Sequence, residues 1–282
     1  MWAVFAICSA LLLGLHDVAK KQALRNNGVL YILLCATGLT TAFLSPFLTG
    51  GPLRDHLFLI FKAVLVTTSW VAGLKAMEIL PITTAATMKA SRPVFVLLLS
   101  IIIYGERLNW IHWTGVAAVF TALYLLSRSS ASEGIDFKRN KGVLLMGVSI
   151  LSGVASALLD KYISQFIEPL FLQSWCNLYI TVILAMIVVF KRLSGKGGTM
   201  PFKWDWMLLV IAVLITGADF LYFQSLNKDG AMLSVISLIR RCSVVVTFTC
   251  GAVIFKERMT GAKVFDMCLM LAGTLLLVVG SL

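Results

Sequence analysis

Long apolar runs separated by short polar connectors occupy almost the whole chain. A helix of about 20 apolar residues crosses the hydrocarbon core of a membrane, because its rise of about 1.5 Å per residue must cover roughly 30 Å. Backbone groups in lipid must bond within the segment, which favours helices. The pattern therefore predicts an all-α integral membrane protein. The ten predicted transmembrane helices cover about residues 2–19, 29–49, 57–76, 82–104, 110–127, 142–160, 169–190, 206–226, 231–254 and 262–280.

Composition supports this class. The chain is 59% hydrophobic and only 13% charged, with a mean hydropathy of +0.93, whereas about a quarter of the residues of soluble proteins are charged. The first apolar run has no basic region in front of it, and Asp17 interrupts its end. We therefore interpret this run as a membrane span rather than a secretory signal peptide.

The net charge of +11 is distributed unevenly over the predicted connectors. With ten spans, successive connectors lie on alternate sides, and one side, which includes Lys263, carries most of the lysines and arginines. The opposite side carries Arg54, Lys62, Arg107, Lys161 and Lys228. The positive-inside rule places the richer side in the cytoplasm and both termini outside. We expect a multi-pass protein of the bacterial inner membrane that has lipids, and no nucleic acid, as partners.

The two halves of the chain resemble each other. The stretch "SIIIYGERLNW" (100–110) aligns with "GAVIFKERMTG" (251–261), which places Glu106 on Glu257 and Lys89 on Arg240. Each half holds five predicted spans, and an odd number inverts the second half in the membrane. We predict two inverted five-helix repeats, 1–128 and 129–282, an arrangement typical of secondary transporters. The charged pairs Glu106-Arg107 and Glu257-Arg258 are expected to fix helix ends.

The repeated stretches resemble a known family. The segment "SRPVFVLLLSIIIYGERLNWIHWTGVAAVFTALYLL" is similar to the second part of the EamA domain, the repeat unit of the drug/metabolite transporter superfamily. The segment "RRCSVVVTFTCGAVIFKERMTGAKVFDMCLMLAGTLLLVVG" is similar as well, although it lacks an equivalent of Pro93 and has Lys256 where Gly105 stands. The resemblance implies ten spans in two inverted halves and transport of small metabolites. It leaves the substrate open, since members export amino acids, nucleotide precursors and drugs.

A looser resemblance concerns three cations. Sugar-phosphate translocators of the same superfamily hold phosphate with a lysine in span four and a Lys-Arg pair in span nine. In this sequence Lys89 stands at the first position, and Arg240 and Arg241 stand at the second. The resemblance implies that these three side chains bind an anionic substrate.

Four cations lie inside the predicted fourth and ninth spans, namely Lys89, Arg92, Arg240 and Arg241. A charge at the bilayer centre costs about 2.5–3.5 kcal/mol on insertion scales and needs compensation. A bound anion is one source. The other is pairing with a carboxylate of this chain, for which the candidates are Asp17, Asp160, Asp219 and Asp266.

We expect Lys89 and Arg240 to hold the acid group of the substrate. Adjacent helical residues face different ways, so we expect Arg241 to pair with Asp219 instead. Pro93 removes a backbone hydrogen bond and predicts a kink in span four. That kink is interpreted either as part of a gate or as static packing.

Two further groups of residues are candidates for the transport site. Asp17 and Asp160, near the ends of spans one and six, are candidates for coupling protons, since burial favours the protonated carboxyl. The alternative for Asp17 is local helical pairing with lysines three and four residues on. Trp70, Trp175 and Tyr222 are candidates for lining a cavity by cation–π or stacking contacts, and core packing is the alternative.

No pattern of an enzyme stands out. The stretch "SGKGGTM" lacks the spacing of a P-loop, and neither a Ser-His-Asp set nor a cluster of metal ligands is visible. We therefore expect no catalysis, cofactor or metal. We predict a secondary active transporter of a small anionic or zwitterionic metabolite, including phosphorylated ones, driven by protons or by exchange. The alternatives are an exporter of amino acids or drugs with structurally paired arginines, and a flippase of a lipid-linked intermediate.

Overall fold

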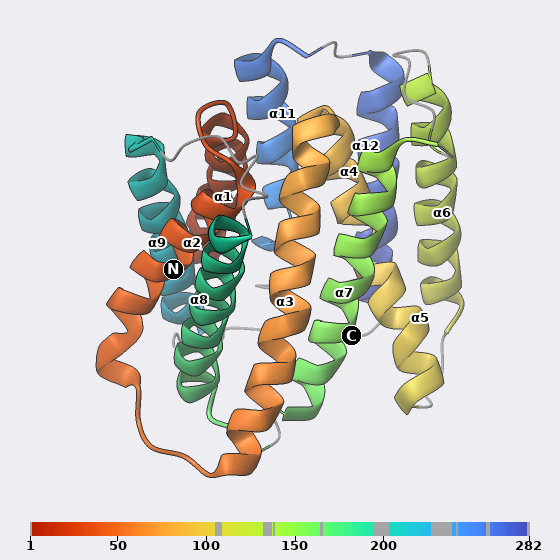
Figure 1. Ribbon diagram of the computed structural model, residues 1–282. Coiled ribbons are helices and arrows are strands. Elements are labelled where there is room, and N and C mark those ends of the chain that lie inside the picture. Colours follow the sequence, from red (N-terminus) through yellow and green to blue (C-terminus); the bar gives the residue numbers. More distant parts are fainter. Residues whose placement is uncertain are drawn as a thin grey trace. The chain divides into compact units, whose positions relative to one another are not determined.

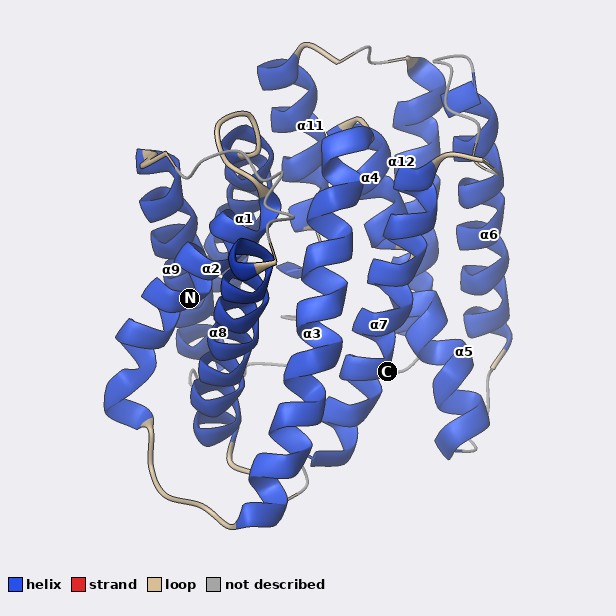
Figure 2. Cartoon of the chain, in the orientation of Figure 1, coloured by secondary structure: helices blue, strands red, loops and turns tan. Residues whose placement is uncertain are grey.

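A computed structural model confirms that the chain is built from helices (Figures 1 and 2). The structure describes residues 2–104, 109–131, 137, 139–163, 166–194, 203–226, 239–240, 242–257 and 260–280. Within these ranges every regular element is helical. The elements are α1 (Trp2–Ala23), α2 (Val29–Leu44), the 3-10 turn η1 (Ser45–Phe47), α3 (Leu53–Ile79), α4 (Ile82–Ala90), α5 (Arg92–Tyr104), α6 (Trp110–Ala131), α7 (Lys141–Ile163), α8 (Pro169–Leu193), α9 (Trp206–Leu226), α11 (Ser243–Phe255) and α12 (Gly261–Val279).

Among the described residues, six helical stretches are long and apolar enough to cross a membrane. These stretches are Ala3–Ala23, Val29–Phe47, Leu53–Ile79, Trp110–Arg128, Lys141–Asp160 and Leu170–Leu193. Shorter apolar helical stretches follow at Trp206–Tyr222 and Ser243–Phe255. These lengths support a multi-pass membrane protein, while the count of ten spans stays a prediction.

The predicted fourth span is broken into two helices. Helix α4 ends at Ala90 and α5 begins at Arg92, with Ser91 between them. The Ser91 N–H bonds to the Met88 carbonyl at 3.1 Å, and the Val94 N–H bonds to the Ser91 carbonyl at 3.0 Å. The kink predicted at Pro93 is therefore a break at Ser91. Pro93 itself sits in the first turn of α5, where a missing N–H is tolerated.

The predicted ninth span carries the same break. The Cys242 N–H bonds to the Ile239 carbonyl at 3.0 Å, and the Val245 N–H bonds to the Cys242 carbonyl at 2.9 Å. When Lys89 is aligned with Arg240, these two bonds fall on the two bonds around Ser91. The repeated sequence thus produces a repeated interruption of the helix just after each cation.

The chain forms two compact units, each assembled from both halves of the sequence. The first unit comprises Met1–Val18, Ala76–Met146 and Leu214–Leu282, and the second comprises Ala19–Lys75 and Gly147–Val213. These units are therefore not the two predicted repeats, whose boundaries stay a prediction.

Close packing of α6 against α12 forms the core of the first unit. Val116, Val119, Met270 and Leu277 are buried there together with Val94 of α5. The helices approach closely because Gly115 and Gly273 lack side chains at the contact, and a Cβ built on Gly115 would lie 2.9 Å from the Gly273 carbonyl oxygen. Small residues at such interfaces allow membrane helices to gain dispersion contacts that lipid does not provide.

Helix α11 ends in a left-handed residue. Lys256 has a φ of 52° and follows Phe255 as the C-cap, a conformation that glycine adopts without strain. The equivalent residue of the first half is Gly105. Lys256, which stands where the first half has Gly105, thus occupies a position whose backbone geometry favours glycine.

The turn at Lys256 directs Glu257 towards the beginning of α4. Its carboxylate accepts the N–H groups of Ile82 and Thr83 at 2.7 and 3.1 Å and the Thr83 hydroxyl at 2.7 Å. The expectation that Glu257 fixes a helix end thus applies to a helix from the other half of the chain. Glu106, Arg107 and Arg258 lie outside the described residues.

In the second unit, α3 and α7 are joined by a reciprocal pair of serines. The Ser69 hydroxyl donates to the Ser149 carbonyl at 2.7 Å, and the Ser149 hydroxyl donates to the Ser69 carbonyl at 2.6 Å. A Cβ on Gly73 would lie 2.7 Å from the Ser149 hydroxyl oxygen. Small polar residues therefore bring these two helices close together.

We predict that Gly115→Ala lowers the melting temperature of the purified protein. The added methyl group meets a backbone carbonyl that cannot move cheaply, and such overpacking costs about 1–3 kcal/mol. Gly147→Ala in α7 is the matched control, because no atom lies within 4 Å of a Cβ at that position. That control should be neutral or stabilising, as alanine favours a helix over glycine. Equal shifts for both variants would contradict the tight α6–α12 contact.

We also predict that Lys256→Gly stabilises the protein by about 1 kcal/mol, because glycine removes the steric conflict of a left-handed residue. Lys256→Ala separates this effect from the loss of charge, since alanine keeps the Cβ. The measurement is thermal unfolding of the three proteins in the same detergent. A stabilisation shared by both variants would mean that the charge, not the backbone conformation, is responsible.

Candidate functional site

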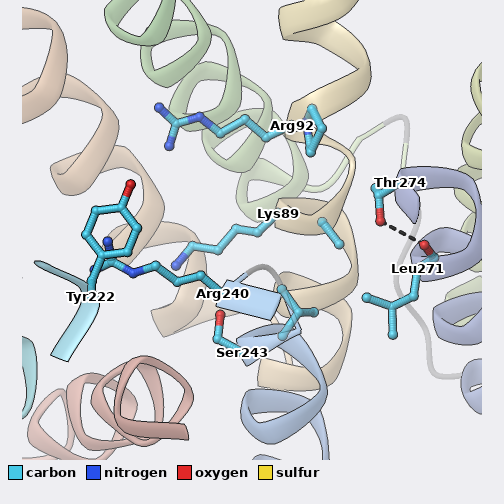
Figure 3. A pocket seen from close by; sticks show the side chains of 10 residues that line it. Lys89, Arg92, Tyr222, Arg240, Ser243, Leu271 and Thr274 are labelled. Atoms are coloured by element: carbon cyan, nitrogen blue, oxygen red, sulfur yellow. Dashed lines mark hydrogen bonds between the residues drawn. The ribbon is translucent and has the colours of Figure 1, made fainter. Parts of the chain in front are cut away.

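A pocket of about 400 Å³ lies in the first unit, between the two helix breaks (Figure 3). Its volume is within the range of small-molecule sites. The lining residues are Lys89, Ala90, Arg92, Pro93, Tyr222, Arg240, Ser243, Val244, Leu271 and Thr274. Lys89, Arg92 and Pro93 from the first break occupy positions equivalent to Arg240, Ser243 and Val244 from the second. The two halves of the sequence thus contribute matching positions to one pocket.

Three cations line this pocket. Lys89 lies in the last turn of α4, Arg92 begins α5, and Arg240 stands three residues before Ser243, the first residue of α11. Figure 3 shows all three side chains extending to the side of the pocket where Tyr222 lies. Lys89 and Arg92 stand on either side of the break at Ser91, three residues apart, and both line this space.

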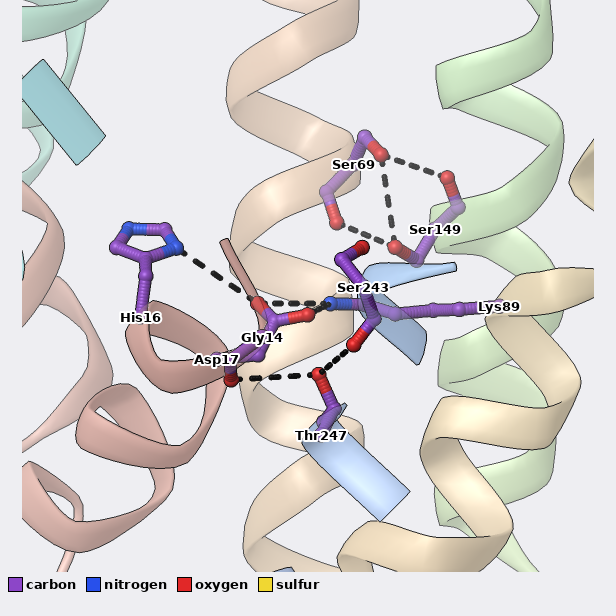
Figure 4. A network of polar contacts seen from close by, with 8 residues as sticks. All are labelled: Gly14, His16, Asp17, Ser69, Lys89, Ser149, Ser243 and Thr247. Carbon is purple, nitrogen blue, oxygen red and sulfur yellow. Dashed lines mark hydrogen bonds and ion pairs between the residues drawn. The ribbon is translucent and has the colours of Figure 1, made fainter. Parts of the chain in front are cut away.

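Lys89 is paired with Asp17 of α1 (Figure 4). The ammonium nitrogen lies 3.2 and 3.4 Å from the two carboxylate oxygens, and His16 Nδ1 lies 3.9 Å from one of them. Both side chains keep partial exposure, 32% for Lys89 and 26% for Asp17. The pair is therefore neither fully exposed nor sealed in the core.

Asp17 stands close to α11 because α1 packs tightly there. A Cβ on Gly14 would lie 2.4 Å from Val246 Cβ and 2.8 Å from the Ser243 carbonyl oxygen. The Thr247 hydroxyl reaches the Gly14 carbonyl at 3.3 Å. The missing side chain at Gly14 thus places the carboxylate of Asp17 beside the pocket.

Arg240 is paired with Asp219 of α9. Its guanidinium also lies over the ring of Tyr222, 4.4 Å from the centroid. Asp219 and Tyr222 are three residues apart on α9 and therefore share a face. The Nε atom of Arg240 is buried and has no hydrogen-bond partner among the described residues, so the guanidinium is only partly satisfied by its protein contacts.

Asp219, which we expected to pair with Arg241, contacts Arg240, and a contact of Asp219 with Arg241 stays a prediction. Arg241 lies outside the described residues. From the sequence, pairing with a carboxylate and lining a substrate pocket were alternative roles for these cations. Lys89 and Arg240 do both.

The remaining predicted site residues belong to the second unit. The Lys20 ammonium lies 5.6 Å from the ring centroid of Trp70. Trp175 packs among aromatic rings and donates its indole N–H to the Thr49 carbonyl at 2.9 Å. Asp160 forms an ion pair with Lys62. None of these residues is among those that line the pocket described above.

Two lysines that the sequence placed in connectors are buried in helices. Lys62 lies inside α3 with an exposed fraction of 8%, and Lys263 lies in the first turn of α12 with an exposed fraction of 1%. Their partners, Asp160 for Lys62 and the Thr83 hydroxyl for Lys263 at 3.3 Å, explain why they tolerate burial. Neither lysine therefore reports on topology, and the orientation of the termini stays a prediction.

The sequence reasoning missed several pocket residues, among them Ser243, Leu271 and Thr274. The internal repeat carried a signal for Ser243, because it aligns with Arg92. Leu271 and Thr274 have no such signal, since they are ordinary residues of an apolar helix. Within the described ranges, no group of three or more His, Cys, Asp or Glu side chains could hold a metal ion.

We predict that Asp17 and Lys89 are thermodynamically coupled. Asp17→Asn and Lys89→Gln should each destabilise the protein, because each leaves a charge without its partner. The loss should be smaller than the roughly 3–5 kcal/mol of a fully buried pair. The double variant should lose less than the sum of the two, as measured by thermal unfolding. Lys141→Gln, at the exposed beginning of α7, is the control. Simple additivity would contradict the coupling.

Comparisons with known proteins agree with this architecture. The model of the EamA-like transporter family matches residues 1–128 and 140–279, which is a copy in each half of the chain. A crystal structure of a protein with 16% sequence identity aligns with 98% of this chain and 96% of its own, with a TM-score of 0.59. At this identity the alignment shows a shared fold only.

One curated relative is a riboflavin transporter of Rhizobium johnstonii. It is 28% identical over 176 residues, which are 62% of this chain and 54% of that protein. The matched segment is thus about half of the relative's length. The resemblance to the EamA domain is confirmed by the family match over both halves. The chain belongs to the EamA-like transporter family, and this membership together with its long apolar helices supports an integral multi-pass membrane protein.

Proposed function

We propose that the protein is a secondary active transporter of a small anionic or zwitterionic metabolite, including phosphorylated ones. The observation that carries this proposal is the grouping of Lys89, Arg92 and Arg240 around one pocket at the two helix breaks. Three cations at one place in a membrane protein are expensive, and a bound anion would offset that expense. Binding sites of secondary transporters commonly lie at such interruptions.

The chemistry of the lining residues suits an acid group attached to a small organic body. An arginine fork binds carboxylate or phosphate through two parallel hydrogen bonds, and a lysine adds a point charge. The Ser243 hydroxyl offers a further polar contact, while Val244 and Leu271 offer apolar surface. The volume of about 400 Å³ suits a metabolite rather than a lipid-linked intermediate.

The ion pairs suggest how binding drives a conformational change. Asp17 and Asp219 form ion pairs with Lys89 and Arg240. An incoming anion competes with these carboxylates, and the freed carboxylates are then available to take up protons. A ligand shifts a conformational equilibrium only through different affinities for the two states. Exchange of partners at Lys89 and Arg240 provides such a difference.

The wider organisation is part of the proposal. Ten spans would form two inverted repeats, 1–128 and 129–282, with the termini outside the bacterial inner membrane. Pro93 and the break before it would serve as a gate between the repeats. Asp17 would couple protons directly at the pocket. Asp160, paired with Lys62 in the second unit, would do so only if that pair also opens during transport.

A neutral planar heterocycle is a second candidate substrate. The riboflavin transporter from Rhizobium johnstonii is a relative of this chain, and Tyr222 with the guanidinium of Arg240 offers a flat surface for stacking. In this case Arg240 would act through its flat face and its hydrogen bonds rather than its charge. Riboflavin and its 5′-phosphate therefore belong in the same binding experiment, because only the second carries an anionic group.

We predict that phosphorylated or carboxylated metabolites raise the melting temperature of the wild-type protein and not that of Arg240→Ala. A ligand at a hundredfold excess over its Kd stabilises the bound state by about 2.7 kcal/mol. Arg240→Lys, which keeps the charge and loses the fork, should retain part of the shift. Asp219→Asn removes the competing carboxylate and should strengthen anion binding.

The screen separates the candidate functions. A shift by riboflavin that equals the shift by its phosphate, and that persists in Arg240→Lys, would favour the heterocycle. Equal shifts by amino acids or organic cations in wild type and Arg240→Ala would make the arginine structural and the anion proposal wrong. Counterflow of the best ligand in proteoliposomes then tests transport itself.

A further inference from the structure

Helix α4 is short, buried and incomplete at its beginning. It has nine residues, and all except Lys89 are buried. Its N-cap residue, Pro81, supplies no side-chain hydrogen bond. The first N–H groups of a helix have no partner within the helix, and such groups are costly to leave unsatisfied inside a membrane. An isolated helix of this length is also unstable, so external contacts must hold it.

Glu257 supplies the missing partners. Its two carboxylate oxygens accept the N–H groups of Ile82 and Thr83 and the Thr83 hydroxyl, at distances of 2.7–3.1 Å. A carboxylate at this place also interacts favourably with the helix dipole. One side chain thus satisfies three donors at the start of α4.

Two further contacts strengthen the same end. The buried Lys263 of α12 donates to the Thr83 hydroxyl oxygen at 3.3 Å. A Cβ on Gly251 of α11 would lie 2.4 Å from Ile82 Cγ2, so α4 lies directly against α11. We call Glu257, Thr83 and Lys263 the clasp. It joins α4 to the end of α11 and to the first turn of α12.

The clasp and the pocket lie at opposite ends of the same two helices. Lys89 is seven residues after Ile82, which corresponds to about 10 Å along a helix. Ser243 begins α11 and lines the pocket with Lys89, while Glu257 follows the other end of α11. A rotation or shift of α4 at the clasp therefore moves Lys89 relative to Ser243 and Arg240.

We propose that Glu257 is a positioning residue for the anion pocket. By holding α4 on α11 and α12 it fixes where Lys89 and the following Arg92 stand opposite Ser243 and Arg240. This inference rests on the proposed function of the pocket. It adds that an acidic residue without contact to the substrate determines how well the cations bind it, because small displacements of a binding group lose much of its effect.

Thiol reactivity at Ser243→Cys tests this inference without knowledge of the substrate. The reporter is the full-length protein in detergent with its six native cysteines replaced by serine. Two methanethiosulfonate reagents are used, one carrying a sulfonate and the other a trimethylammonium group. The ratio of their rates measures the local preference for anions, since a cluster of cations raises the local anion concentration.

We predict that Glu257→Gln lowers this rate ratio about threefold or more, because Lys89 moves away from Ser243→Cys. Loss of a negative charge by itself would raise the ratio, so the sign separates positioning from plain electrostatics. Thr83→Val removes part of the clasp without changing charge and should lower the ratio as well. It also preserves the test if Glu257→Gln does not fold.

Glu168→Gln is the matched control, since Glu168 stands at the N-cap of α8 and makes no side-chain cap hydrogen bond. The rate ratio of this control should stay unchanged.

Lys89→Gln distinguishes the two proposals. If it lowers the ratio and the folded clasp variants do not, the positioning role is wrong and the anion pocket stands. If Lys89→Gln leaves the ratio unchanged, the anion pocket is wrong, and the positioning role falls with it.

Discussion

The expense of charge in a membrane is the constraint on which this structure depends. Lys89 faces Asp17, Arg240 faces Asp219, and Lys62 faces Asp160. Each of these cations sits in or beside an apolar helix, and each has a carboxylate within reach. In the pocket the pairs stay partly exposed, which leaves them open to competition from another anion. A pairing that compensates the cations thus also leaves them within reach of a ligand.

The broken helices bring these charges together. The breaks at Ser91 and Cys242 lie beside Lys89 and Arg240, so equivalent residues of the two halves line one pocket next to equivalent interruptions. The beginning of α4 creates a second need, because the first N–H groups of a helix require acceptors outside it. Glu257 provides them from the other half of the chain.

Small residues set the distances between the helices. Gly14 allows α1 to pack closely against α11, and Gly115 and Gly273 allow α6 to pack closely against α12. Membrane helices gain little from a hydrophobic effect in lipid, so close approach must supply the attraction. A methyl group at Gly14 would displace Asp17 from the pocket, although Gly14 itself carries no polar side chain. The positions of charged side chains thus depend on glycines that carry no functional group.

The sequence by itself determined the helical class, the family, the internal repeat and the unusual positions of Lys89, Arg92 and Arg240. The length of an apolar run and the charges inside it can be read from the sequence alone. Their consequences follow from the thickness and low polarity of the bilayer, whatever the fold. Only the tertiary structure decided the partners. It paired Asp219 with Arg240, buried Lys62 and Lys263, divided the predicted fourth span at Ser91, two residues before Pro93, and placed Trp70, Trp175 and Asp160 in a different unit from the pocket. Which carboxylate meets which cation depends on helix rotation and on breaks in the helices, and these follow from contacts between residues far apart in the chain.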